Sequence, residues 1–179
     1  MTLIEAKILL EKRRIPYQTA QYESEADYLR HCMPFPDTGN ARNCQVIALV
    51  IPAVNDAKDI ELQFNRRRGE YIFEELWFGG YSFDMACYDS ALLEADLLEY
   101  IGQIVDRKLG VIEISDQRKK RRKTTLCFDL SDDDDVFGVQ GFRDTLEQID
   151  TPKTLWQKLI GQRIQYDIYD WLNYRQVIK

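Results

Sequence analysis

The chain has 179 residues, of which 45% are hydrophobic, and carries 24 basic and 30 acidic side chains for a net charge of −6. This length fits a single domain with a true hydrophobic core, and the composition excludes a disordered chain. The acidic balance argues against a protein that coats nucleic acid, although a local basic patch could still bind one. Because it shows no apolar run near the ~20 residues of a bilayer span, no signal-peptide pattern and only scattered cysteines, we expect a cytoplasmic protein with free thiols.

A helix followed by a meander of four strands is predicted for the first half of the chain. Thr2 and Glu5 form a capping box, and the helix should end near Arg14 because Pro16 disfavours helix at the residue before it. Residues 17–32 fit an edge strand or a short helix, and residues 33–43 are rich in loop formers. Apolar patterns predict strands over 44–51, 60–65, 71–78 and 81–87, with turns at 66–69 and 79–80. We expect the first strand to be central in its sheet and the second to be half exposed.

The second half is predicted to contain a helix, a hairpin and a helical C-terminal part. Ser90 caps a helix that Leu109 and Gly110 close, and strands follow over 111–115 and 123–130. From Gly138 the apolar spacing is helical, with Thr151 as a further N-cap. The fold class is therefore α+β, with a mostly antiparallel six-stranded sheet made of the meander, a helix crossover and the hairpin. The N-terminal and C-terminal helices pack on this sheet, and one domain spans residues 1–179, with the sheet core over 1–137 and the helical part over 138–179.

Two basic turns are the candidates for anion binding. Strand directions through the meander, together with a right-handed crossover, place both turns at the same end of the domain. Such a patch could contact a phosphate backbone or an acidic partner. The alternative is that both are solvated turns, because like charges cannot be buried unpaired. The candidate residues are Arg66, Arg67, Arg68, Arg118, Lys119, Lys120, Arg121 and Arg122.

An aspartate-rich run over residues 129–135 is the candidate for cation binding, or for attracting a basic partner. It lacks the glycine and the glutamate of an EF-hand loop, so a solvated loop is the alternative. His31 and Cys32 are adjacent, and no cysteine or histidine spacing in the chain is that of a zinc site. We therefore predict no metal, no cofactor and no catalytic residue.

Six aromatic residues are candidates for contacting a partner. Trp77, Phe78, Tyr81 and Phe83 surround the Gly79-Gly80 turn, and Tyr166 and Tyr169 lie near the C-terminus. Aromatic rings are enriched at protein interfaces, but the same rings also pack cores, which is the alternative here. The glycine turn with its aromatic neighbours resembles motifs of small bacterial domains, toxin-neutralising immunity proteins among them. No residue role is taken from that resemblance.

The first functional hypothesis is a cytoplasmic protein-binding domain of the immunity or inhibitor kind that has no catalytic motif. Its acidic charge and abundant aromatics suit rapid capture of a partner, and its opposite charge runs would also allow self-association. The second hypothesis is a carboxylate-based enzyme that acts on a phosphorylated or anionic ligand near the basic turns. The third is a weak nucleic-acid binder that uses the two basic turns.

Overall fold

The computed structural model describes residues 1–33, 35–36, 38–54, 58–83, 85, 90–118, 120–130, 145, 147, 149 and 163–179. In chain order the elements are α1 (Leu3–Lys12), β1 (Gln18–Tyr22), α2 (Glu25–Cys32), β2 (Val46–Ile51), β3 (Ile60–Arg67), β4 (Glu70–Phe78), β5 (Tyr81–Phe83), α3 (Ser90–Val105), β6 (Leu109–Asp116), β7 (Arg121–Asp129), β8 (Ile164–Tyr169) and β9 (Tyr174–Ile178). None of these helices combines the length and the apolar run that a bilayer crossing needs.

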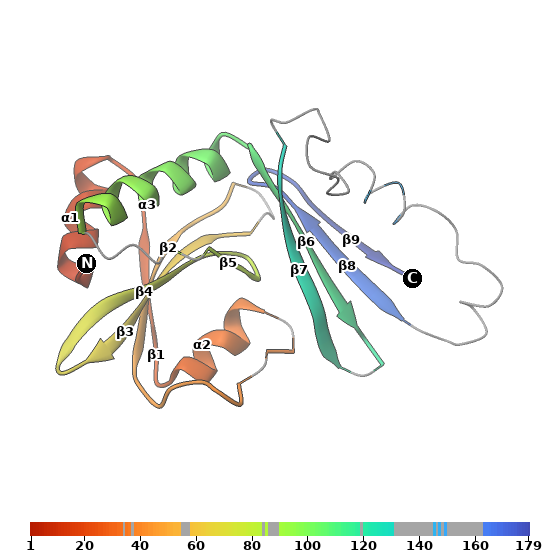
Figure 1. Cartoon of the computed structure of the whole chain (residues 1–179), viewed down its shortest axis with the longest axis horizontal. Coiled ribbons are helices and arrows are strands. Elements are labelled where there is room, and N and C mark those ends of the chain that lie inside the picture. Colours follow the sequence, from red (N-terminus) through yellow and green to blue (C-terminus); the bar gives the residue numbers. More distant parts are fainter. Residues whose placement is uncertain are drawn as a thin grey trace.

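The strands form two antiparallel sheets. Sheet A has the order β1-β2-β3-β4-β5, and sheet B has the order β7-β6-β8-β9. Figure 1 shows them side by side, with α1 and α3 on one face of sheet A and α2 on the other. The predicted α+β class is confirmed, but the single six-stranded sheet is not observed. The reason is that β6 hydrogen-bonds to β7 on one edge and to β8 on the other, so no edge of β6 remains for sheet A.

Strands, not helices, end the chain. Residues 164–169 and 174–178, which are predicted to be helical, form the β8–β9 hairpin. Ile164 and Ile168 are spaced as on a helix face, but with Tyr166 between them they also share one face of a strand, so the apolar pattern is ambiguous. The predicted helix start at Thr151, and the aspartates of 131–135, lie outside the described residues.

Local signals in the first half of the chain are mostly confirmed. The capping box is present, with Thr2 N donating to Glu5 Oε2 at 2.7 Å and Glu5 N donating to Thr2 Oγ1 at 3.3 Å. Residues 17–32 contain both of the predicted alternatives, an edge strand (β1) and a short helix (α2) that Ser24 caps. The central position of β2 is also confirmed, because β2 pairs with β1 and β3.

One prediction of exposure and one prediction of a helix boundary are wrong. Residues 60–65 of β3 are buried on both faces instead of half exposed, because α2 covers the face that carries their polar side chains. The helix predicted to close at Leu109 and Gly110 ends at Val105, and Arg107 supplies the left-handed residue with φ of +59°. Leu109 and Gly110 instead begin β6.

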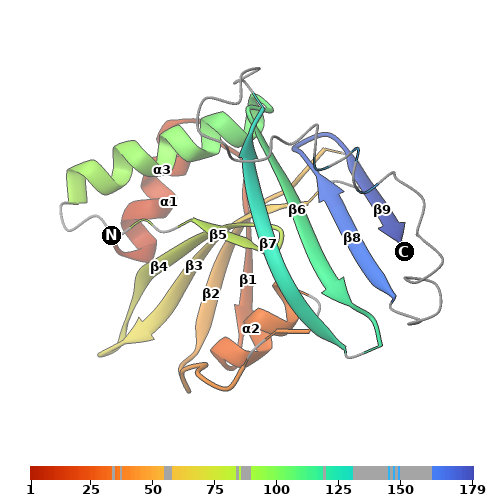
Figure 2. The ribbon, with the colours of Figure 1, turned by 45° about the vertical axis from the view of Figure 1, so that its right-hand side comes forward.

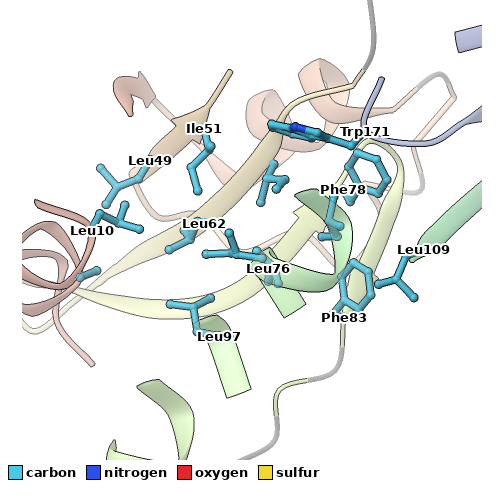
Figure 3. Close-up of a cluster of buried hydrophobic side chains, with 14 of the residues drawn as sticks. Leu10, Leu49, Ile51, Leu62, Leu76, Phe78, Phe83, Leu97, Leu109 and Trp171 are labelled. Carbon is cyan, nitrogen blue, oxygen red and sulfur yellow. The ribbon is translucent and has the colours of Figure 1, made fainter. Parts of the chain in front are cut away.

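The main hydrophobic core lies between sheet A and the helices α1 and α3. It extends onto the end of sheet B that carries Leu109 and Trp171 (Figure 3). Leu10 of α1 and Leu97 of α3 pack there with Leu62 and Leu76 of the sheet. Trp171, from the turn between β8 and β9, reaches the same core, and its ring centroid lies 6.4 Å from that of Phe78. The core therefore joins the two sheets.

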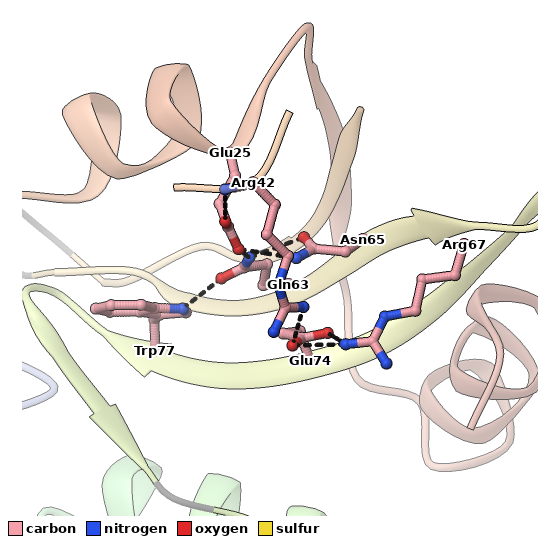
Figure 4. Close-up of polar contacts among 7 residues, drawn as sticks. All are labelled: Glu25, Arg42, Gln63, Asn65, Arg67, Glu74 and Trp77. Carbon is pink, nitrogen blue, oxygen red and sulfur yellow. Dashed lines mark hydrogen bonds and ion pairs between the residues drawn. The ribbon is translucent and has the colours of Figure 1, made fainter. Parts of the chain in front are cut away.

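A polar network covers the opposite face of sheet A (Figure 4). Glu25, in the first turn of α2, accepts hydrogen bonds from Gln63 Nε2 at 3.2 Å and Asn65 Nδ2 at 2.8 Å. Trp77 Nε1 donates to Gln63 Oε1 at 2.9 Å. These bonds satisfy polar groups that would otherwise be buried unpaired, and they fix α2 on the sheet.

The turn between β8 and β9 is organised by one carboxylate. Asp170 Oδ1 accepts the backbone N–H groups of Leu172 at 2.8 Å and Asn173 at 2.9 Å, and Asp170 Oδ2 accepts Arg107 Nη2 at 3.0 Å. Burial alone would raise the pKa of Asp170, but the hydrogen bonds from Arg107, Asn173 and the backbone outweigh it and lower that pKa below 3.8. The ionised side chain therefore stabilises the fold.

This turn predicts a pH-dependent loss of stability. An acid with a depressed folded-state pKa contributes stability above its unfolded-state pKa, near 3.8, and loses it as the pH falls through the folded-state pKa. We expect Asp170→Asn to lower the free energy of unfolding by about 1 kcal/mol at neutral pH, with the difference shrinking below about pH 4. Urea unfolding from pH 3 to 7 measures it, with Asp106→Asn as an exposed control. A difference that stays constant with pH would contradict this role.

Candidate functional site

Two buried carboxylates lie side by side in sheet B. Glu113 of β6 and Asp167 of β8 are directly opposite each other, so their side chains share one face of the sheet. Glu113 is 2% exposed and Asp167 is 4% exposed. Neither forms an ion pair with any described residue. Buried acids are normally paired with a cation, so this arrangement is costly and calls for a functional explanation.

Each carboxylate accepts a hydrogen bond from a tyrosine. Tyr169 donates its hydroxyl to Glu113 Oε1 at 2.7 Å, and Tyr174 donates to Asp167 Oδ1 at 2.6 Å. The two tyrosines are themselves opposite each other in β8 and β9. Burial, followed by the hydrogen bond to Asp167, raises the pKa of Tyr174 to about 12, and burial raises the pKa of Tyr169 well above its usual value. Both hydroxyls therefore remain protonated donors at neutral pH.

The other hydrogen bonds of the pair also come from neutral groups. Glu113 Oε1 accepts the backbone N–H of Gly80 at 2.9 Å, which ties the β4–β5 turn to sheet B. Asp167 accepts Gln165 Nε2 at 2.7 Å and Gln176 Nε2 at 2.9 Å. Neutral donors orient the two carboxylates without cancelling their charge.

One cation lies near the pair without touching it. Lys58 Nζ is 5.9 Å from the ring centroid of Tyr169 and 5.4 Å from that of Tyr174, within the range of a cation–π interaction. Lys58 is half-buried and forms no ion pair with a described acid. We call the group formed by Glu113, Asp167, Tyr169, Tyr174, Gln165, Gln176 and Lys58 the carboxylate–tyrosine site.

Solvent reaches this site from the β9 side. Tyr174 is 39% exposed and Gln176 is exposed, whereas Glu113 lies deeper in the sheet. Ile164 and Lys179 exchange both backbone hydrogen bonds, at 2.6 and 2.7 Å, and such pairs alternate along an antiparallel ladder. The backbone groups of Tyr174, Gln176 and Ile178 therefore point away from β8, toward the outer edge of the sheet.

Four of the six aromatic residues predicted to contact a partner are in the core. Trp77, Phe78, Phe83 and Tyr169 are at most 6% exposed, so the alternative of core packing describes them. Tyr81 and Tyr166 are half-buried: Tyr81 packs against the main core, and Tyr166 packs on the opposite face of sheet B. Of the six, only Tyr169 enters the carboxylate–tyrosine site.

The predicted anion-binding residues are divided between two hairpin turns that lie on the same side of the molecule (Figure 2). Arg66 donates to Gln45 Oε1 at 2.7 Å, and Arg67, together with Arg42, pairs with Glu74. Arg68 forms the β3–β4 turn with Gly69. Arg118 and Lys120 belong to the β6–β7 turn, while Lys119 and the side chains of Arg121 and Arg122 lie outside the described residues. Glu113 and Asp167 lie in sheet B, whereas Arg66, Arg67 and Arg68 lie at the β3–β4 turn of sheet A.

A third polar group surrounds Glu61. The Cys32 thiol donates to Glu61 Oε2 at 3.7 Å, and His31 Nε2 lies 3.9 Å from Glu61 Oε1. The nearby Tyr28 hydroxyl is buried without a hydrogen-bond partner among the described residues. Burial raises the pKa of both Cys32 and Glu61. Within the described ranges, no three His, Cys, Asp or Glu side chains converge in a way that could hold a metal ion.

Sequence reasoning missed Glu113, Asp167 and Lys58. One signal was available, because Glu113 interrupts the apolar run from Val111 to Ile114. The alternation of Gln165, Asp167 and Tyr169 was hidden by the helical interpretation of the C-terminal part. Comparison of the chain with protein-family models, with curated proteins and with solved structures finds no match.

Proposed function

We propose that the chain is a protein-binding domain that acts in the cytoplasm, in the manner of an immunity protein or inhibitor, and that its partner is basic. The observation that carries this proposal is the Glu113–Asp167 pair, which no described cation neutralises and which lies behind the exposed edge of β9. A partner that brings a positive charge to this edge would relieve the repulsion between the two acids.

The composition of the site supports binding over catalysis. Tyrosines and oriented charges are typical of the few interface residues that carry most of the binding energy. The net charge of −6 would also speed the encounter with a basic partner.

The proposal is tested by affinity capture from a lysate of the source cells with a matched pair of variants. Asp167→Asn removes a charge from the site, while Asp106→Asn removes the same charge from an exposed position near the end of α3. We expect the wild type and the Asp106→Asn control to recover the same basic protein in stoichiometric amount, and Asp167→Asn to recover at least about tenfold less. Thermal unfolding of each variant confirms that it is folded.

Recovery by all three chains would place binding elsewhere, and recovery by none, with a purely monomeric elution profile, would argue against a protein-binding role. Recovery of nucleic acid whose amount falls steeply with salt would favour the basic turns instead.

A further inference from the structure

We infer that the carboxylate–tyrosine site binds a guanidinium group, the head of an arginine side chain on the partner, and that this group displaces the Lys58 ammonium. This inference rests on the proposed function and specifies the chemistry of its site. Three observations support it. Carboxylate oxygens of Glu113 and Asp167 can accept further hydrogen bonds, the ring of Tyr174 beside them is partly exposed, and the Lys58 ammonium lies over that ring.

The open acceptors belong to both carboxylates. No described residue donates to Glu113 Oε2, although the Glu113 side chain is 98% buried, because both of its hydrogen bonds end on Oε1. Asp167 Oδ2 accepts a single hydrogen bond, from Gln165. A carboxylate oxygen can accept two hydrogen bonds, so the pair offers acceptor sites on neighbouring strands that the fold does not use.

The aromatic part of the site is already suited to a cation. The ring of Tyr174 is partly exposed, and its hydroxyl is tied to Asp167, so its orientation is set. Lys58 Nζ lies over this ring and over that of Tyr169 but reaches neither carboxylate. Lys58 thus marks where a positive charge is favoured, while the hydrogen-bonding capacity of the two acids remains open to a better-fitting donor.

A guanidinium fits these features better than an ammonium or a metal ion. It is planar and weakly hydrated, so it can stack on an aromatic face while its fork of N–H groups donates to carboxylate oxygens. An ammonium has no planar face, and the Lys58 ammonium, although it lies over both rings, forms no ion pair with either carboxylate. The described residues provide no three-ligand cluster for a metal.

The test is a titration of the full chain with N-acetyl-arginine amide, in which binding is measured from the NMR chemical shifts of residues in β8 and β9. The neutral isostere N-acetyl-citrulline amide and the lysine analogue are the matched ligands. We expect saturable shifts at Tyr174 and Gln176 with a dissociation constant on the order of 1 mM. The lysine analogue should bind at least about threefold more weakly, and the citrulline analogue should cause no saturable shift.

Two variants make the result specific. Lys58→Met removes the competing ammonium from a half-buried position and is expected to tighten arginine-amide binding about threefold, whereas Asp167→Asn should weaken it at least about tenfold. Asp106→Asn should bind like the wild type. Equal binding of all three ligands, or no change in the Lys58→Met variant, would overturn the inference. If a partner is captured through Asp167 while arginine amide does not bind, the guanidinium assignment fails and the proposed function stands.

Discussion

Replacing Gly80 with alanine is expected to lower the free energy of unfolding by about 3 kcal/mol. A Cβ atom at this position would lie 2.5 Å from the carboxylate of Glu113, a distance that real Cβ atoms do not reach. The carboxylate cannot easily move away, because Tyr169 donates to it and the side chain is buried on all sides. The Gly80 N–H that bonds to Glu113 would be displaced at the same time.

Denaturant unfolding measures this effect, and Gly102 provides the matched control. Gly102 lies within α3, and a Cβ added there meets nothing within 4 Å. Gly102→Ala should therefore leave the fold intact and raise its stability by about 0.5–1 kcal/mol, the helix preference of alanine over glycine. If Gly80→Ala is as stable as Gly102→Ala, the close contact of the two sheets at Glu113 is not present in solution.

Elements governed by neighbouring residues could be predicted from the sequence. The capping box of Thr2 and Glu5 depends on residues three apart, and the apolar run of Val46–Ile51 marks a strand that is covered on both sides. The turn at Arg68 and Gly69 also follows from local chemistry at Gly69, because glycine accepts the positive φ that a two-residue hairpin loop requires, +93° at this position. Arg68 adopts its positive φ, +52°, because of the turn and not because of its own preference.

The division into two sheets could not be predicted, because it depends on pairing between distant segments. The predicted hairpin strand at 111–115 pairs with residues 164–169, about fifty positions later in the chain. The sequence of neither segment indicates which other segment it pairs with. The alternation in Ile164–Tyr169 is that of a strand, but its apolar residues are also four apart, and propensity alone does not decide between the two structures.

The carboxylate–tyrosine site could not be predicted for the same reason, because it also depends on pairing between distant strands. Tyr169 was recognisable as an aromatic residue of interest, but its partner Glu113 becomes visible only when β6 and β8 are adjacent. The aromatic residues around Gly79 and Gly80 were recognised for their composition, yet three of them are core residues. Trp77 packs against Tyr28 of α2, Phe83 against Tyr100 of α3, and Phe78 against Tyr169 of sheet B. Composition identified the neighbourhood of the site, and strand pairing determined which side chains face it.

Replacing Glu113 with alanine is expected to lower the free energy of unfolding by about 2–4 kcal/mol, even though it removes a buried charge. Two effects oppose each other. Loss of repulsion from Asp167, directly opposite, would stabilise the fold by up to about 1 kcal/mol. Loss of the acceptor removes the hydrogen bonds that Glu113 Oε1 accepts from the Gly80 N–H and from the Tyr169 hydroxyl. The Gly80 N–H then keeps its contact with the Tyr169 hydroxyl at 3.0 Å, and that hydroxyl keeps its contact with Phe78 O at 3.1 Å. Hydrogen bonds to a charged acceptor are worth about 1.5–3 kcal/mol each, so the second effect is larger.

A double-mutant cycle separates the two effects. Glu113→Gln keeps an acceptor oxygen and removes the charge, so we expect it to cost clearly less than Glu113→Ala. Tyr169→Phe removes the hydroxyl, and its combination with Glu113→Ala should show a coupling of about 1–2 kcal/mol, because each variant breaks the same hydrogen bond. If Glu113→Ala is instead more stable than the wild type, repulsion dominates and the pair is retained at the expense of stability.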